Sequence, residues 1–286
     1  MAQLTNTQLS ATIDEVWDLD VLQARYAAAV IMPRVLNRSD LVKKSGDTIH
    51  IPIKKRLVVG TVASDGGFTP DAQTLTQVDV SVDTWKYVSN ETLDQTEAQS
   101  YWSPESDFPK DAGEVLGEDY DGSLANLYSN LTSNVIGSEA NPTPFDDTAM
   151  LAAMLKLADR NIPKNALSFI LPPIAFYLGL FKLDRFTDAD KAGLPKNVLT
   201  TNFRFPLLGV PAYETTLLKT PGGTTAIKGF LLHKETLAIG MQMNNKFKRA
   251  EATAAAKFST IVAMESLYGV KTVREEHGVV INIRNS

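Results

Sequence analysis

The sequence contains no cysteine among its 286 residues. This absence excludes disulfide bonds, thiolate metal ligands and cysteine nucleophiles. The stability of the fold must therefore come from burial of apolar surface or from association with other chains.

The chain also lacks any apolar run near about 18 residues, the length at which a segment becomes a candidate membrane helix. Its opening residues, MAQLTNTQLSATIDE, show neither the basic region nor the apolar region of a secretory signal. We therefore expect a protein that has no membrane segment and is not secreted by the usual route.

An excess of positive charge is missing as well. The chain has 28 Lys and Arg residues against 33 Asp and Glu residues, which gives a net charge of −5. A protein that grips nucleic acid through its phosphates needs a clustered basic face. The composition, with 44% apolar and 21% charged residues, is that of an ordinary globular chain of one large or two modest domains.

Recognisable catalytic motifs are absent. The sequence contains no G-x-S-x-G, no G-x-x-x-x-G-K-[ST] and no G-x-G-x-x-G. Its three histidines, His50, His233 and His277, are far apart in the sequence and are expected to be ordinary surface or packing residues. We expect no enzymatic activity, no cofactor and no metal site.

One acidic group is weighed as an exception. The carboxylates are those of Asp111, Glu114, Glu118 and Asp119. They could in principle form an acid/base pair or a divalent-ion site. A solvated helix start, where the helix dipole favours negative charge, is the simpler interpretation.

Two helices are predicted with clear starting signals. The segment Thr12-Ile13-Asp14-Glu15 fits a capping box, and its helix is expected to run to about Met32, where Pro33 stops it. A second and much longer helix is expected from about residue 107 to about 135. Its apolar stripe consists of Ala112, Val115, Leu116, Leu124, Leu127, Leu131 and Val135.

Between these helices lies a predicted hairpin. Ile49, Ile51 and Ile53 share one face of a strand within residues 45–60, and the return strand, residues 77–85, carries valines at every second position. The connection GTVASDGGFTPDAQTLT has the composition of a polar, flexible turn. Because an isolated two-stranded ribbon is marginal in water, we expect another subunit to cover its apolar face.

The second half of the chain predicts an α/β region. Helices are expected at residues 148–160 and 174–181, and residues 184–206 are expected to form a surface loop. Met150, Leu151, Met154, Leu155 and Ala158 are predicted to point inward from the first of these helices. Strands are expected at residues 166–171, 209–218, 226–232, 237–242, 270–273 and 279–283.

The order of these segments resembles the major capsid proteins of tailed bacteriophages, an α+β fold of the Hong Kong 97 type. The resemblance spans nearly the whole chain. It lies in the order and spacing of the helices, the hairpin and three short motifs. These motifs are GDTIHIP at 46–52, LLGVPAYETTLL at 207–218 and SLYGVKTVREEHGVVI at 266–281.

The resemblance implies a division of the chain into four parts. Residues 1–47 would be an N-terminal arm and residues 48–86 an extended E-loop hairpin. Residues 87–140 and 245–286 would form the peripheral domain, with its spine helix at about 107–135. Residues 141–244 would form the axial domain.

The resemblance also implies a function. The chain would be a virion protein, assembled in the bacterial host cytoplasm, whose pentamers and hexamers close an icosahedral shell around double-stranded DNA without sequence-specific contacts. Expected partners are a separate scaffolding protein, because the arm helix comes almost at the start of the sequence, and a portal. Decoration proteins are a candidate source of stabilisation, and no covalent crosslink is assumed.

Assembly contacts are expected between the hairpin and a neighbouring subunit. Lys54, Lys55 and Arg56 would face the acidic helix start of the neighbour, and the hairpin would also present Phe68. The acidic partners would be Glu114, Glu118 and Asp119.

Two alternatives to the capsid hypothesis remain. One is an encapsulin-like compartment shell, which shares the fold but encloses enzymes. The other is a non-assembling α/β ligand-binding or hydrolytic protein that uses the acidic helix start.

Overall fold

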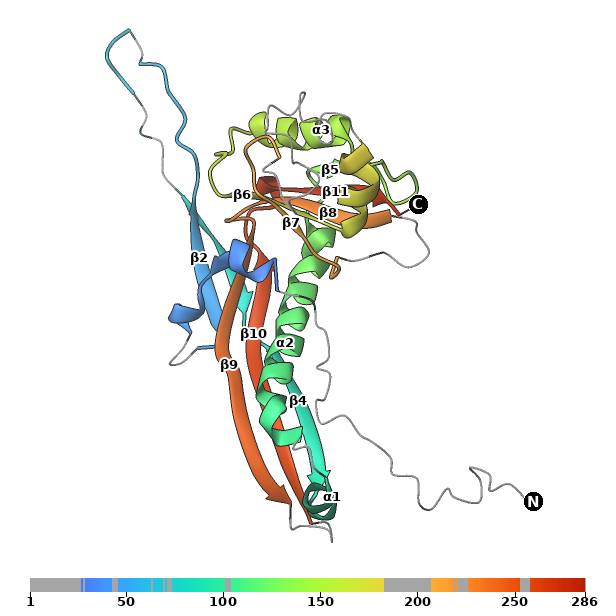
Figure 1. Cartoon of the computed structure of the whole chain (residues 1–286). Coiled ribbons are helices and arrows are strands. Elements are labelled where there is room, and N and C mark those ends of the chain that lie inside the picture. The colour runs from blue at the N-terminus through green and yellow to red at the C-terminus, as the bar shows by residue number, and fades with distance from the viewer. Residues whose placement is uncertain are drawn as a thin grey trace, which may run out of the picture.

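The residues that the structure describes form three β-sheets, one long helix and several short helices (Figure 1). The computed structural model describes residues 27, 29–42, 46–62, 64–68, 70, 74–100, 104–182, 207–218, 220, 226–252 and 258–285. Among these residues, no helix is long and apolar enough to cross a membrane. The mixture of helices and strands confirms the α+β class.

The longest sheet has the strand order β1-β9-β10-β4. Its central pair is β9 (Leu237–Ala252) and β10 (Ser259–Thr272), which run antiparallel. β4 (Thr84–Leu93) pairs with β10, and the short β1 (Leu36–Asn37) pairs with β9. The strand predicted at 237–242 is therefore longer than expected and runs to Ala252, into an Ala-rich segment where propensity alone favours a helix.

Helix α2 (Pro104–Ala125) lies along the long sheet (Figure 1). Its buried residues, including Leu116 and Leu124, pack with Tyr268 of β10 in one continuous core. The helix ends ten residues earlier than predicted. Asparagines and other weak helix formers follow it, and the chain continues as the 3₁₀ helix η4 (Asn126–Asn130).

The second sheet has five strands in the order β5-β11-β8-β6-β7. The strands span Val135–Ile136, Gly278–Arg284, Ala226–His233, Leu167–Leu171 and Ala212–Glu214, in that order. β8 pairs antiparallel with both β11 and β6, and every residue of β6 is buried. This confirms the strands predicted near residues 166–171, 226–232 and 279–283.

Helix α3 (Asp147–Ala158) covers this sheet, beginning close to the predicted position. Asp146 caps it by accepting a hydrogen bond from the Ala149 amide at 2.9 Å. The predicted inward face is only partly correct. Met150 is buried, but Leu151 and Leu155 are exposed, and the smaller Ala149 and Ala153 lie in the core with Leu157 instead.

The remaining helices are short. They are η2 (Met32–Arg34), η3 (Ser39–Leu41), α1 (Asp94–Gln99), the π-helical η5 (Ala175–Gly179), η6 (Leu180–Lys182) and η7 (Glu275–His277). The helix predicted from Thr12 lies outside the described residues up to residue 26, and residues 27, 29 and 30 are not helical. The loop predicted at 184–206 also lies outside them.

Candidate functional site

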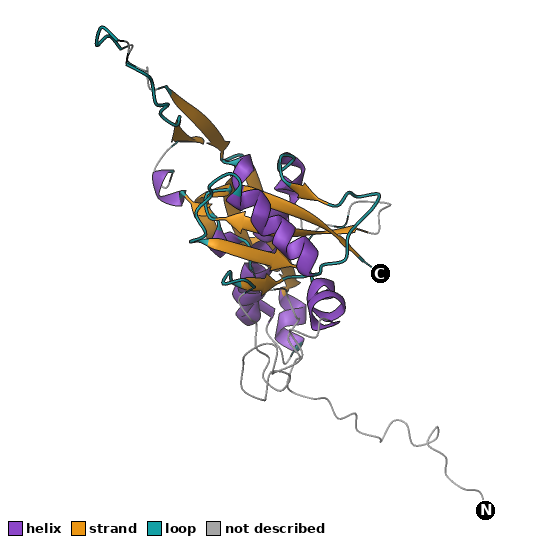
Figure 2. Cartoon of the chain, turned by 90° about the horizontal axis from the view of Figure 1, so that it is seen from above, coloured by secondary structure: helices purple, strands orange, loops and turns teal. Residues whose placement is uncertain are grey.

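The predicted hairpin is formed by β2 (Thr48–Lys54) and β3 (Leu75–Ser81). The two strands pair antiparallel from Thr48 opposite Ser81 to Lys54 opposite Leu75. Figure 2 shows the hairpin extending from the body of the molecule, with its loop at the far end. Its residues therefore divide into a base close to the sheets and a distal arm, which we define as residues 54–75.

The base is covered by its own chain, which corrects the prediction that a neighbour covers this face. Ile49 is 2% exposed and Val80 is 1% exposed, and both lie in a core with Ala238 of β9 and Val273. The strand pattern correctly identified the apolar face. The cover comes from residues almost two hundred positions further along the chain, which that pattern does not indicate.

The distal arm has the opposite character. Val59 is 98% exposed and Phe68 is 74% exposed, so uncovered apolar side chains lie directly before the predicted polar turn and also within it. The large apolar residues exposed on it are Leu57, Val58, Val59, Val62, Phe68 and Leu75. Such a concentration of apolar surface marks an interaction site rather than scattered surface residues.

The basic residues predicted to make assembly contacts lie at the start of the distal arm. Lys54, Lys55 and Arg56 are all exposed, directly before the apolar run. In Figure 1 the distal arm points away from α2. The basic group and the acidic residues of α2 are therefore not brought together within one chain.

Two of the three predicted acidic partners are already engaged inside the subunit. Asp119 accepts hydrogen bonds from Lys86 at 2.5 Å and from the Tyr268 hydroxyl at 2.6 Å. The carboxylate of Glu118 accepts a hydrogen bond from the Ala27 amide. Glu114 is exposed on the surface of α2.

Asp121 has a structural task that the sequence pattern did not indicate. Its carboxylate is fully buried and accepts hydrogen bonds from the backbone amides of Val30, Ile31 and Met32. These bonds hold the segment that precedes η2 against α2. Burial raises the pKa of Asp121, and the three amides oppose that shift.

A second exposed surface lies on β4. Trp85 and Tyr87 alternate along the strand and are both exposed. The indole N–H of Trp85 donates to Glu265 on β10 at 3.2 Å, and Lys248 of β9 forms an ion pair with the same carboxylate at 2.6 Å. The hydrogen bond from Lys248 is the main reason that the pKa of Glu265 is lowered.

The histidines are not all isolated. His50 forms a hydrogen bond with Asp79 on the neighbouring strand at 2.6 Å, whereas His233 and His277 face one another with ring centroids 5.4 Å apart. Glu235 lies beside this pair. The only sequence signal for the cluster is the H-x-E spacing of His233 and Glu235.

Comparison with known proteins places the fold. No family model matches the chain, and no curated protein matches it by sequence. Solved structures do match. A chain from Mycobacterium phage Che8 is 21% identical, with 94% of this chain and 97% of that chain covered and a TM-score of 0.79.

Two cyanophage capsid structures match over a similar extent. The capsid structure of cyanophage P-SCSP1u is 14% identical, with 99% of this chain and 96% of that chain covered and a TM-score of 0.78. The capsid asymmetric unit of cyanophage Pam1 is 12% identical, with 97% of this chain and 98% of that chain covered and a TM-score of 0.73. The chain therefore has the fold of these phage capsid structures, which confirms the resemblance at the level of fold.

Proposed function

We propose that the chain is a major capsid protein, a structural and non-enzymatic subunit of a phage head. Pentamers and hexamers of the chain would close an icosahedral shell around packaged double-stranded DNA. The observation that carries the proposal is the uncovered apolar surface of the distal arm on a chain with the fold of phage capsid structures.

The distal arm supplies the driving force for assembly. Burial of apolar surface contributes about 25 cal/mol per Å². Its exposed residues, above all Val59 and Phe68, have no cover in the described part of their own subunit. Docking on a neighbour would provide that cover, and closed symmetry would repeat the contact around each pentamer and hexamer.

The proposed division assigns most of the long sheet to the peripheral domain and most of the five-stranded sheet to the axial domain. Residues 48–86 would be the E-loop hairpin, α2 the spine helix of the peripheral domain, and the five-stranded sheet the centre of the axial domain. β11 lies within residues 245–286 but pairs with β8 of the five-stranded sheet. This pairing supports moving its strand to the axial side of the boundary.

The contacts of α2 reduce the number of acidic residues that are free to pair with a neighbouring subunit. Asp119 and Glu118 have partners inside the subunit, whereas Glu114 is exposed. Glu114 is therefore the first choice as partner for the basic residues at positions 54–56 of a neighbour. Such a pair would fix the register of docking more than it would add affinity.

The proposed location is the virion, after assembly in the host cytoplasm. A separate scaffolding protein and a portal are the proposed assembly partners, and decoration proteins remain candidates. The net charge of −5 supports enclosure of DNA without a tight or sequence-specific grip.

The arm is tested by the double variant Val59→Ser and Phe68→Ser. Both side chains are exposed, so the subunit should unfold at an unchanged denaturant concentration but fail to form particles. Leu155→Ser is the matched control, since Leu155 is also exposed but lies on α3. Sedimentation velocity and electron microscopy of expressed protein give the outcome, and normal particles from the double variant would contradict the role of the arm.

The charge pairing has its own test. Reversal of Lys54, Lys55 and Arg56 to Glu should impair assembly without unfolding the subunit, and Glu114→Lys in the same chain should partly restore it. Normal particles from the first variant, or no recovery in the second, would refute the pairing with Glu114.

The contents and size of the expressed product separate the alternatives. Particles that hold protein cargo instead of DNA would indicate an encapsulin-like shell. A stable 31.2 kDa monomer at every concentration would indicate a non-assembling protein.

A further inference from the structure

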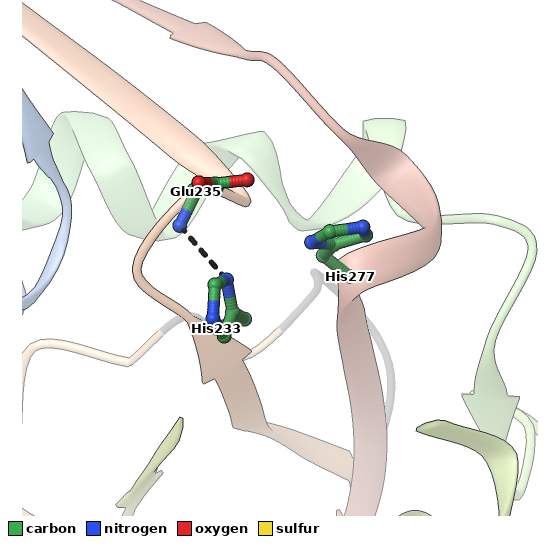
Figure 3. A group of neighbouring side chains, drawn as sticks. All are labelled: His233, Glu235 and His277. Carbon is green, nitrogen blue, oxygen red and sulfur yellow. Dashed lines mark hydrogen bonds between the residues drawn. The ribbon is translucent and has the colours of Figure 1, made fainter. Parts of the chain in front are cut away.

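Three side chains converge at one end of the five-stranded sheet (Figure 3). His233 is the last residue of β8, Glu235 lies in the turn that leads to β9, and His277 directly precedes β11. β8 and β11 are neighbours, with Leu232 opposite Gly278, so the strand pairing brings the two histidines together. One potential ligand atom from each of the three residues lies within 4.8 Å of the others.

Both turns that carry these residues are held by backbone hydrogen bonds. The Thr236 amide donates to the His233 carbonyl at 2.9 Å, and the His277 amide donates to the Arg274 carbonyl at 3.2 Å. A further bond from the Val273 amide to the Thr236 carbonyl, at 2.8 Å, joins the two turns. The cluster is therefore largely arranged by the backbone before any ligand arrives.

One ring nitrogen of the pair, on His277, is free to bind a ligand, and Nδ1 of His233 is bound only weakly. Nδ1 of His277 is buried and has no hydrogen-bond partner among the described residues. Nδ1 of His233 accepts a long hydrogen bond from the Glu235 amide at 3.3 Å, so its lone pair faces the turn. A buried ring nitrogen without a partner is rare in native proteins, and a bound ion is one of its recognised explanations.

We infer that His233, Glu235 and His277 form a binding site for one divalent transition-metal ion of the zinc or nickel class. Imidazole nitrogen and carboxylate oxygen are the ligands that such ions prefer. Two ligand atoms on one tetrahedral zinc ion lie about 3.3 Å apart, so the ligand atoms, now within 4.8 Å of one another, must approach by up to about 1.5 Å. The ion would tie the β8–β9 turn to the start of β11, a role independent of the proposed capsid function.

Arg274 opposes the ion. Its Nε lies 3.5 Å from the Glu235 carboxylate, so its positive charge competes with a metal ion for that group. Removal of this competing cation should therefore tighten metal binding. This effect has the opposite sign to the loss of a ligand, which makes it a sharp test.

The experiment uses the full chain, purified without a histidine tag, freed of metal with a chelator and titrated with zinc chloride or nickel chloride. Calorimetry should show one ion per chain, and zinc should raise the melting temperature reversibly. Glu235→Gln and His277→Gln should each weaken binding by at least about tenfold, since loss of even an outer partner of a metal ligand commonly costs that much. Arg274→Gln should strengthen binding.

The control is His50→Gln, which removes the remaining histidine of the chain and should leave binding unchanged. The melting temperature of each metal-free variant shows whether it is folded. The Glu235→Gln variant should be folded, because Glu235 is exposed. Absence of saturable binding, binding unchanged in Glu235→Gln, or binding lost in His50→Gln would each overturn the inference. These outcomes do not depend on particle formation.

Discussion

The backbone of Gly269 lies directly against the backbone of Ser81. A β-carbon added to Gly269 would stand 1.9 Å from the Ser81 carbonyl oxygen, far inside contact distance. Gly269 pairs in register with Gly240 on β9, where a β-carbon would stand 2.3 Å from Cδ1 of Ile49. The two glycines together form the flat seat on which the base of the hairpin rests.

This seat predicts different costs for two alanine substitutions. Gly269→Ala meets backbone, which cannot rotate away, and should destabilise the subunit by at least about 1–3 kcal/mol, the usual range for overpacking. Gly240→Ala meets the end of the flexible Ile49 side chain and should cost less. Urea unfolding of both variants gives the comparison, and Ile49→Val should relieve Gly240→Ala but not Gly269→Ala. Equal costs for the two glycines would contradict this description of the seat.

Removal of the Asp121 carboxylate should cause a large loss of stability. Asp121→Ala leaves the amides of Val30, Ile31 and Met32 without their acceptor, and an unpaired buried group such as the Ile31 amide costs about 1–3 kcal/mol. Asp121→Asn keeps one acceptor oxygen and should cost less. Asp111→Ala, on the same helix, is the matched control and should have little effect. The checks are denaturant unfolding and the rate of proteolysis before η2, and an unchanged rate in Asp121→Ala would argue against the anchor.

Replacement of the buried Lys228 should lower the stability of the fold. Its side chain is 3% exposed, and its Nζ lies 2.6 Å from Glu139 and 2.5 Å from the side-chain oxygen of Asn282. Lys228→Met should cost about 1–3 kcal/mol, because the buried oxygen of Asn282 then loses its donor. Glu139→Gln should cost less, since the Glu139 side chain is half exposed. Thermal unfolding ranks the two, and the reverse order would contradict the prediction.

Ionisation of Glu265 should contribute to the pH dependence of the stability of the fold. The pKa of Glu265 is lowered from its ordinary value of 4.5, chiefly by the hydrogen bond from Lys248. Its ion pair therefore stabilises the fold above about pH 4.5, and this contribution is lost as the pH falls through the lower folded pKa. Glu265→Gln should be less stable than the natural chain at pH 7, and the difference should shrink towards pH 3. Glu251→Gln, an exposed change on β9, controls for net charge, and a constant gap across the pH range would contradict the assignment.

The sequence predicts the elements better than it predicts what covers them. The alternation of Ile49 and Ile51 was sufficient to place a strand and its apolar face. The residues that cover this face, such as Ala238 and Val273, are distant in the chain, and the glycines that allow close contact have no pattern of their own. The same limit explains α3, where apolar side chains surround the helix and only the packed sheet selects Met150 over Leu151.

For the candidate sites, too, the sequence predicted local features but not contacts between distant segments. Exposed charge at residues 54–56 was correctly expected on the hairpin, and its pairing with a neighbour stays a prediction. The H-x-E spacing brings Glu235 close to His233, but the addition of His277 could not be expected from the sequence, because it depends on the pairing of β8 with β11. Nothing in the sequence singled out Asp121, because its role depends on the return of the chain at Val30.

Only Val82 and Asp83 separate the hairpin strand β3 from β4 of the long sheet. A pull on the distal arm would therefore pass through two residues into a strand of ten residues that is paired with β10 along its whole length. Tension along such a strand is shared by all its backbone bonds at once, whereas a pull across the sheet would open them singly. If internal pressure in a filled shell pulls its subunits apart, this connection would transmit the force along β4. The force would then act parallel to the strands β4 and β10, the direction in which a sheet resists separation most strongly.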